Sequence, residues 1–196
     1  MKTIVSKETG LVEVKKSRFH GMVIPIDQVE RISPLLKEIR QQHPKARHIC
    51  YAYRIWRSGE IVESAYDDGE PRFTAGQPIL WALRRADLVN VIGIVIRYFG
   101  GILLGKGGLI RAYGATIRTA LSNARIVTFE PFTETRLTLS SVAAIRFEQF
   151  ARRHHICIRQ RHYTPDGVTF QIHLPSQCQN EFEQFLKAHI SGNASS

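Results

Sequence analysis

The sequence predicts an α+β protein built from two domains, and three observations lead to this prediction. The first two thirds of the chain follow the order strand, strand, helix, strand, strand, helix, strand, helix, whereas the remainder follows β-α-β-β-α. The pair Glu130-Pro131 interrupts the chain between these two parts. The charge changes at the same place, because residues 1–127 carry a formal net charge of +9 and residues 128–196 only +1. We therefore expect a basic first domain over residues 1–127 and a smaller domain over residues 128–196.

Five strands and three helices are expected in the first domain. The strands cover residues 3–14, 19–26, 49–57, 60–66 and 90–97. One helix ends near His43, and the other two cover residues 78–85 and 109–125. Polar turns are expected at residues 15–18 and at Ser58-Gly59. Ser33 is the expected N-cap of the first helix, because Pro34 then takes the first helical position. The strand over residues 90–97 is apolar on both faces, which is typical of a central buried strand.

The second domain is predicted to have a ferredoxin-like fold without its last strand. Its elements are expected at residues 133–139, 142–154, 156–163, 168–174 and 176–190, in the order β-α-β-β-α. Residues 191–196 are too few and too polar to supply the last strand.

Composition limits the class of protein. Hydrophobic residues make up 43% and charged residues 22% of the chain, which is typical of a packed globular protein. The longest apolar stretch, residues 91–96, is far shorter than the roughly 20 residues that cross a bilayer, and the first residues lack the apolar core of a signal peptide. The three cysteines are Cys50, Cys157 and Cys178. This odd, sparse set indicates a reducing compartment, so we expect a cytoplasmic protein without a membrane partner.

The most informative segment is the glycine-rich stretch between the buried strand and the longest helix. Glycine allows a close approach to the backbone, and the beginning of a helix offers free N–H groups that suit phosphate. The predicted nucleic-acid or phosphate-binding residues are Arg97, Gly100, Gly101, Gly105, Lys106, Gly107, Gly108 and Arg111. The alternative is a tight connection over residues 98–108 in which Ile102, Leu103 and Leu104 fill the core. Lys15, Lys16 and Arg18 are predicted to form a secondary basic patch.

A second segment concentrates acidic residues. Asp67, Asp68 and Glu70 lie within four positions of one another, in a loop that ends at Pro71. Such carboxylates could hold Mg²⁺ or act as acid and base. They could equally satisfy a buried arginine by forked hydrogen bonds, or fix the loop through an Asx turn at Asp67. We favour the structural role.

Motifs of known catalytic chemistry are missing from the sequence. The glycine-rich segment matches neither the Walker A loop nor the dinucleotide-binding fingerprint. The chain has no Gly-x-Ser-x-Gly elbow, and His48-x-Cys50 has no second pair at a spacing that zinc would need. We therefore predict no catalytic residue, no metal and no cofactor.

The glycine-rich segment, residues 97–113, closely resembles the signature of the IMPACT family. The resemblance extends to Asp67–Pro71 and to the short motifs Thr74-Ala75-Gly76, Lys16-Ser17-Arg18-Phe19 and His48-x-Cys50-Tyr51-Ala52, and it covers about residues 14–125. It implies a ribosomal protein S5 domain 2-like first domain with helices on one face. The second domain looks like the last domain of translocating elongation factors.

The resemblance also implies an association with translation. Eukaryotic members of the family damp the amino-acid-starvation response by competing for the activator of an initiation-factor kinase, and no catalytic residues carry over. We therefore expect a non-enzymatic, translation-associated factor whose basic domain contacts RNA or the ribosome. The alternatives are a nucleotide- or phosphate-binding enzyme, in which the acidic loop holds Mg²⁺, and a protein-interaction module with a partner in translation control.

Overall fold

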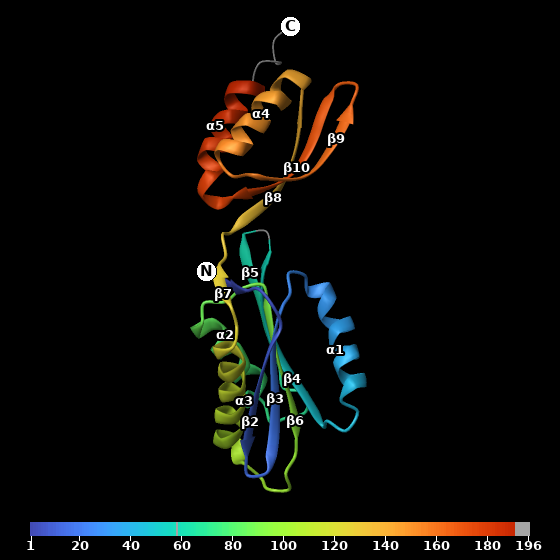
Figure 1. Ribbon diagram of the computed structural model, residues 1–196, viewed down its shortest axis with the longest axis vertical. Coiled ribbons are helices and arrows are strands. Elements are labelled where there is room, and N and C mark those ends of the chain that lie inside the picture. Colours follow the sequence, from blue (N-terminus) through green and yellow to red (C-terminus); the bar gives the residue numbers. More distant parts are fainter. Residues whose placement is uncertain (58, 191–196) are drawn as a thin grey trace. The chain divides into compact units, whose positions relative to one another are not determined.

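The computed structural model describes residues 1–57 and 59–190, and the chain divides into two compact units (Figure 1). The first unit is Met1–Phe129, and the second begins at Glu130. Ser58, one half of the expected Ser58-Gly59 turn, lies outside the described residues. The expectation that residues 191–196 supply no last strand concerns residues that are likewise not described. The mixture of helices and antiparallel sheets confirms the α+β class.

The first unit is built on a five-stranded antiparallel sheet in the order β2-β3-β6-β4-β5. These strands are β2 (Glu8–Val14), β3 (Ser17–Pro25), β4 (His48–Arg57), β5 (Glu60–Tyr66) and β6 (Val91–Tyr98). Strand β6 lies at the centre and is buried from Val91 to Arg97, because its apolar side chains meet a packed layer on both faces. The sequence prediction of a central buried strand is confirmed.

A separate two-stranded sheet joins the two ends of the first unit. Strand β1 (Lys2–Ile4) pairs with β7 (Ile126–Thr128), and the Phe129 N–H donates to the Met1 carbonyl. The expected single strand over residues 3–14 is therefore wrong: the chain leaves this small sheet after Ile4 and enters the large sheet at Glu8. The pairing also carries the first unit two residues beyond the expected boundary at residue 127.

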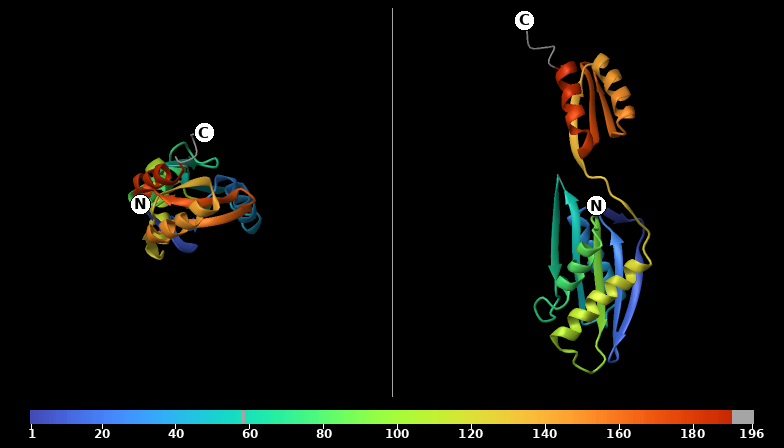
Figure 2. Two further views of the ribbon diagram at one scale, coloured as in Figure 1. Left: turned by 90° about the horizontal axis from the view of Figure 1, so that it is seen from above. Right: turned by 90° about the vertical axis from the view of Figure 1, so that its left-hand side faces the viewer.

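Helices cover both faces of the large sheet, as Figure 2 shows from two further directions. Helix α1 (Ile32–Gln42) packs on one face against alternate β6 residues such as Ile92 and Ile94. Helices α2 (Gly76–Arg85) and α3 (Gly105–Ser122) pack on the other face, against Val91 and Val95. Neighbouring residues of β6 point to opposite faces of the sheet, and the residues on both faces are apolar, so each face is covered by helices. The expectation of helices on one face is therefore wrong.

All three helices of the first unit begin earlier than the sequence predicts, and α2 begins at Gly76, two residues before the expected Pro78. A 3₁₀ turn, η1 (Val29–Arg31), leads into α1, so Arg31 occupies the N-cap position that was assigned to Ser33. Pro34 is tolerated there because the first-turn N–H groups of a helix have no partner within it. Helix α3 begins at Gly105, so residues 105–108 form its first turn and the glycine-rich loop shortens to residues 99–104.

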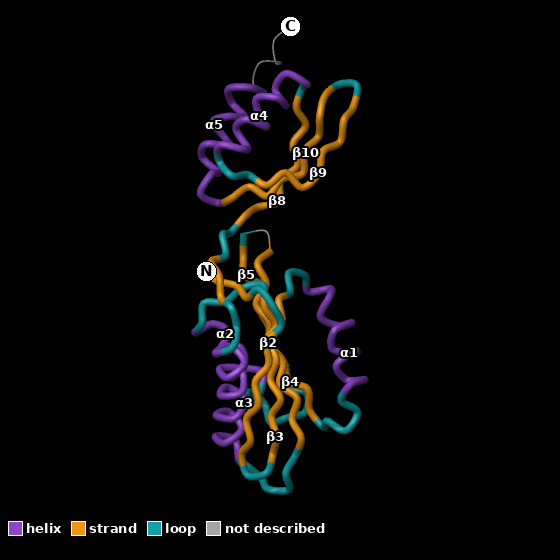
Figure 3. The backbone as a smooth tube through the Cα atoms, in the orientation of Figure 1, coloured by secondary structure: helices purple, strands orange, loops and turns teal. Residues whose placement is uncertain are grey.

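The second unit confirms the order β-α-β-β-α. Its elements are β8 (Phe132–Leu139), α4 (Ser141–Arg153), β9 (Cys157–Thr164), β10 (Gly167–Pro175), the 3₁₀ turn η2 (Ser176–Cys178) and α5 (Gln179–Ile190). The strands form an antiparallel sheet in the order β8-β10-β9. Both helices lie on one face of it (Figure 3), where Phe147 meets Phe170 at a ring-centroid distance of 5.0 Å. Ser140 caps α4 by accepting a hydrogen bond from the Ala143 N–H.

Across the described ranges, residues 1–57 and 59–190, none of the helices combines the length and the hydropathy that a bilayer crossing requires.

The three thiols differ in environment, and their reactivity should differ accordingly. Cys50 and Cys178 are buried and Cys157 is exposed. Burial raises the pKa of the Cys50 thiol, and it raises the pKa of the Cys178 thiol as well. Because the thiolate is the reactive form, a thiol reagent at neutral pH should label Cys157 rapidly and the other two only after unfolding. Absorbance with a disulfide reagent counts the thiols, and Cys157→Ser should remove the rapid phase. Rapid labelling of two or three thiols in the native protein would contradict this assignment.

Candidate nucleic-acid interface

Four connections of the first unit gather at one end of the large sheet. The start of β3 pairs with the end of β6 at Arg18 and Tyr98, and the end of β6 pairs with the start of β4 at Arg97 and His48. The connections at this end are therefore the β2–β3 turn, the α1–β4 loop, the acidic loop after β5 and the glycine-rich loop before α3, drawn at the lower end of this unit in Figure 1.

The glycine-rich loop packs directly against the β2–β3 turn. The Gly100 N–H donates to the Ser17 hydroxyl at 3.1 Å, and Ser17 is fully buried. A Cβ on Gly100 would lie 2.1 Å from the Lys16 carbonyl carbon, so only glycine allows this contact. Lys15 and Lys16 form the turn with positive φ angles of 46° and 65°. The two predicted basic segments are thus held together, although they lie about 85 residues apart in the chain.

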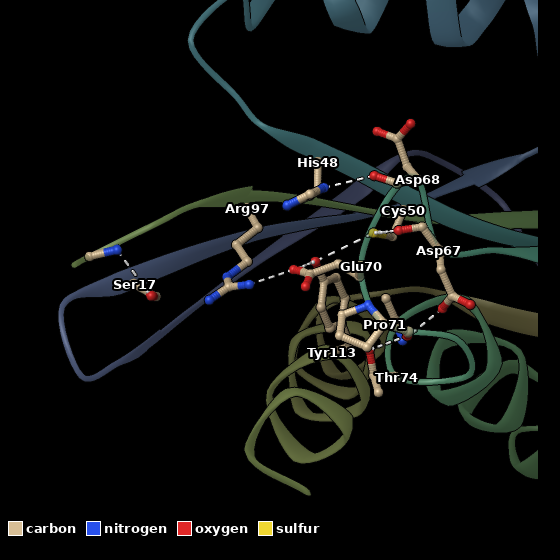
Figure 4. A network of polar contacts seen from close by, with 12 residues as sticks. Ser17, His48, Cys50, Asp67, Asp68, Glu70, Pro71, Thr74, Arg97 and Tyr113 are labelled. Carbon is tan, nitrogen blue, oxygen red and sulfur yellow. Dashed lines mark hydrogen bonds and ion pairs between the residues drawn. The ribbon is translucent and has the colours of Figure 1, made fainter. Parts of the chain in front are cut away.

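Arg97 does not lie on the surface, contrary to the expectation that it contacts nucleic acid. Its exposed fraction is 6%, and its Nη1 donates to Glu70 Oε1 at 2.6 Å (Figure 4). The Tyr113 hydroxyl donates to the same carboxylate oxygen at 2.8 Å. Burial raises the pKa of this hydroxyl, so it remains a donor to Glu70. Residue 97 belongs to the set of β6 residues that faces α2 and α3, which explains its burial.

The acidic loop is tied to the protein by each of its carboxylates. Asp67 accepts hydrogen bonds from three backbone N–H groups, those of Phe73, Ala75 and Gly76, at 2.8 to 3.0 Å. These bonds fix the entry into α2. Asp68 accepts from the Ile49 N–H at 2.7 Å and pairs with Arg40 at 2.6 Å.

The carboxylates of this loop therefore point to separate partners and share no centre. Among the described residues, no group of three or more His, Cys, Asp or Glu side chains is arranged to hold a metal ion. The contacts of Asp67, Asp68 and Glu70 are those of carboxylates that hold the loop in place.

Exposed cations remain at this end once Arg97 is excluded, and we call this set the basic end. Its members are Lys15, Lys16, Arg18, Lys45, Arg47, Lys106 and Arg111. Within the part of the chain that the structure describes, none of the seven forms an ion pair. Sequence reasoning missed Lys45 and Arg47, although the run of basic and histidine residues from Arg40 to His48 was a signal that could have identified them.

The glycine-rich loop exposes apolar side chains beside these cations. Leu103 is 83% exposed and Ile102 43%, and Phe99 is also exposed. The alternative in which Ile102, Leu103 and Leu104 fill the core is therefore correct for Leu104 alone, which packs partly buried against the core of the α2 and α3 face. The glycine-rich loop and the start of α3 therefore expose both charge and apolar surface.

An aromatic and basic cluster lies at the same end of the sheet, on the face that α1 covers. The Tyr98 ring lies under the Arg18 guanidinium at 5.9 Å and edge-on to His20, and its hydroxyl is 2.7 Å from His43 Nδ1. Partial burial lowers the pKa of His20, and the neighbouring Arg18 and His43 add to this effect.

The lowered pKa of His20 predicts how stability depends on pH. The unfolded chain binds a proton at His20 more readily than the folded chain, so the stability that neutral His20 provides is lost as the pH falls from above 6.5 through the folded pKa. The free energy of unfolding of the first unit should therefore fall between pH 7.5 and pH 5.5, and less steeply in His20→Gln. Urea denaturation followed by tryptophan fluorescence measures this, because both tryptophans, Trp56 and Trp81, lie in the first unit. Equal slopes for the two proteins would contradict the prediction.

Comparison with known proteins assigns a class to this fold and this end of the sheet. The family model described as the Impact N-terminal domain matches residues 15–121, which include the β2–β3 turn, the acidic loop and the glycine-rich loop. The first unit is therefore an Impact N-terminal domain. Taken with the relatives below, this match shows that the chain belongs to the IMPACT family.

Several relatives are similar over much of the chain. The IMPACT family member YigZ of Escherichia coli is 41% identical over 127 residues, which are 64% of this chain and 62% of YigZ. The family member YvyE of Bacillus subtilis is 31% identical over 190 residues, covering 96% of this chain and 87% of YvyE. A crystal structure described as that of a hypothetical protein aligns with a TM-score of 0.72 at 32% identity, covering 98% and 93% of the two chains. Other matches cover less of the chain: the protein named IMPACT of Rattus norvegicus is 34% identical over 96 residues, which are 46% of this chain and 29% of that protein. The structure of the two-domain translational regulator Yih1 aligns with a TM-score of only 0.36 at 22% identity, covering 63% of this chain and 47% of that chain.

Proposed function

We propose that this IMPACT-family protein is a non-enzymatic, cytoplasmic, translation-associated factor that binds RNA, free or within the ribosome, through the basic end of its first unit. The observation that carries this proposal is the gathering of seven exposed cations at one end of the sheet, none of which forms an ion pair among the described residues. They lie in the β2–β3 turn and the start of β3, in the α1–β4 loop and in the first two turns of α3. Family membership brings the expectation of a role in translation with it.

The geometry of the acidic loop supports the proposal. An acidic cluster beside a phosphate-binding surface would ordinarily repel RNA. Here Arg97 neutralises Glu70 in the interior, and Asp68 pairs with Arg40. The exposed cations are left to interact with phosphates, and the release of condensed counterions favours binding. Arg97 is thus a positioning residue in this proposal and not a contact.

The glycine-rich loop also supports the proposal that the basic end binds RNA. The contact between Gly100 and Lys16 holds the lysine turn next to the start of α3, where Lys106 and Arg111 lie. The free N–H groups of the first turn of α3 add positive potential at the same place.

A filter-binding titration with a structured RNA tests the proposal. We expect measurable affinity at low salt and a steep loss of affinity as the salt concentration rises, since each neutralised phosphate adds about 0.7–0.9 to the slope of log K against log salt. A dissociation constant above about 100 μM at low salt, or an affinity independent of salt, would overturn the electrostatic mechanism.

We also infer the finer fold of each unit. The sheet order β8-β10-β9, with both helices on one face, supports a ferredoxin-like second unit. The first unit is inferred to be ribosomal protein S5 domain 2-like, with α1 on its second face. A protein partner in translation control would then have the second unit available to it.

A further inference from the structure

Strand β8 forms one edge of the sheet in the second unit. It pairs with β10 on one side, and within residues 130–190 no strand pairs with its other side. The pairing with β10 keeps one continuous register from Phe132 opposite Pro175 to Leu139 opposite Val168. The free edge of β8 is therefore regular along the strand. On the sheet face away from the helices, its exposed side chains include Glu134, Arg136 and Thr138.

The hydrogen-bond phase of β8 shows which backbone groups face this free edge. The Ser176 N–H donates to the Pro131 carbonyl at 3.0 Å, at the beginning of the β8–β10 ladder. In an antiparallel pair, every second residue bonds to the neighbouring strand, and the residues between them direct their N–H and C=O groups to the other side. Residues 133, 135, 137 and 139 therefore bond to β10. The groups of Glu134, Arg136 and Thr138 are directed to the free edge.

The two edges of this sheet differ in how well they are protected against a further strand. On the opposite edge, the pairing of β9 with β10 shifts register between Gln171 and Ile172, which leaves Arg159 as an extra residue. Such a bulge opposes the addition of a strand. Strand β8 has no bulge, proline, glycine or lysine, and three of its eight residues are threonines, which favour strands. An edge of this kind is a template for pairing with another chain.

The order of charges along β8 is self-complementary. When two antiparallel copies of β8 are centred on Thr135, Glu134 of each copy lies opposite Arg136 of the other. Both members of this pair direct their backbone groups to the free edge, so the same register also forms the hydrogen bonds. Thr135 lies near the middle of the strand, and nearly the whole strand is therefore paired.

The two charged side chains are available for this pairing. The side chain of Glu134 is 80% exposed, although its Oε1 lies 3.3 Å from His173 Nε2. Arg136 is exposed, and it forms no ion pair in the part of the chain that the structure describes. A second copy of β8 would therefore give this guanidinium a carboxylate partner.

A second copy of the chain is the occupant that these charges favour. Residues 128–196 carry a formal net charge of only +1, so two second units can approach each other without strong repulsion. A nucleic acid would meet a carboxylate beside each guanidinium on this edge, which does not suit a polyanion. We propose that the chain forms a dimer in which two β8 strands pair antiparallel about Thr135. Residues that face each other in such a pair share a sheet face, so the dimer has a six-stranded sheet with the helices of both copies on one face.

Analytical ultracentrifugation of the full chain over a range of concentrations tests the proposal. We expect a reversible monomer–dimer equilibrium with a dissociation constant between about 10 μM and about 1 mM, because an interface of one strand pair is small. A chain that stays monomeric up to about 1 mM would overturn the proposal, and the edge would then be open only to an extended segment of another protein.

Charge reversals test the register, and their mixture controls for misfolding. Arg136→Glu and Glu134→Arg should each raise the dissociation constant about tenfold or more, because like charges then face each other. An equimolar mixture of these two variants should associate at least as tightly as the unchanged chain, because every facing pair is then attractive. Arg159→Glu makes the same charge change at an exposed residue of β9 and should leave the equilibrium unchanged.

Amide hydrogen exchange, read by nuclear magnetic resonance at two concentrations, tests the pairing at single residues. The N–H groups of Glu134 and Arg136 should exchange more slowly in the concentrated sample, whereas those of Thr133 and Thr135 should not change, because they already bond to β10. A dimer that Arg136→Glu does not weaken, a mixture of variants that fails to associate, or exchange at Glu134 and Arg136 that does not depend on concentration would each overturn the proposal.

Discussion

Replacing Glu70 by glutamine is expected to lower the free energy of unfolding of the first unit by about 3–5 kcal/mol, because it leaves the Arg97 guanidinium charged in the interior without its counter-charge. Both side chains of this pair are more than nine-tenths buried. The Arg97 Nε has no hydrogen-bond partner among the described residues, so loss of the carboxylate would remove the one ion pair that this guanidinium makes there. Urea denaturation followed by tryptophan fluorescence measures the effect.

Two further variants distinguish the buried charge from a change of shape. The double variant Glu70→Leu with Arg97→Met removes both charges, and it should be more stable than Glu70→Gln, because an apolar pair in place of a buried ion pair is often neutral. Asp27→Asn breaks the exposed pair with Arg31, where both side chains are 62% exposed, and it should cost less than about 1 kcal/mol. Equal losses of unfolding free energy in Glu70→Gln and Asp27→Asn would show that the buried pair contributes no more to stability than the exposed pair.

The order of the elements in the two larger sheets and of the helices was predictable because each depends on local pattern, whereas the short strands β1 and β7 were missed. Alternation marks β4, and a run that is apolar on both faces marks β6 as the central strand. The interior of each helix was recognisable from its periodic apolar residues. The helix ends were less so. A 3₁₀ turn precedes Ile32, and α3 includes residues 105–108 although three of these four are glycines, which a helix disfavours.

The candidate site was predictable as a region but not as a set of side chains. The glycine-rich loop and the β2–β3 turn were both selected by composition, yet their contact at Gly100 depends on the pairing of β3 with β6. Arg97 was selected as a basic residue beside glycines. Its burial follows from strand register, which decides whether residue 97 faces the core or the solvent.

The ion-pair partner of Arg97 could be predicted in part from the chemistry of its side chain. A carboxylate in the acidic loop was expected for a buried arginine, and Glu70 is that carboxylate. That Glu70 and neither aspartate makes the pair depends on the loop, where Asp67 is held by three backbone N–H groups and Asp68 by Ile49 and Arg40.

Charge reversal at the basic end is expected to have the largest effect on RNA affinity. The triple variant Lys15→Glu, Lys16→Glu, Lys106→Glu changes three exposed side chains that form no ion pair in the described residues, so the fold should persist. Each lost phosphate contact should reduce the salt slope by about 0.7–0.9, so the slope should fall by about 2–3 and the affinity at low salt by a factor of at least ten. Filter binding over a range of salt concentrations measures both quantities.

A matched control distinguishes RNA binding at the basic end from attraction of RNA by the net charge of the whole chain. Lys2→Glu, Lys7→Glu, Arg85→Glu makes the same change of net charge at exposed residues near the opposite end of the large sheet, where β2 begins and the Lys2 N–H bonds to Asp87. If the basic end is the contact surface, the control should retain most of the slope and affinity, because screening limits the influence of distant charges to about 10 Å at 0.1 M salt. If both triples weaken binding equally, RNA responds to the net charge of +10 as a whole and the gathering of cations on the sheet end has no role of its own.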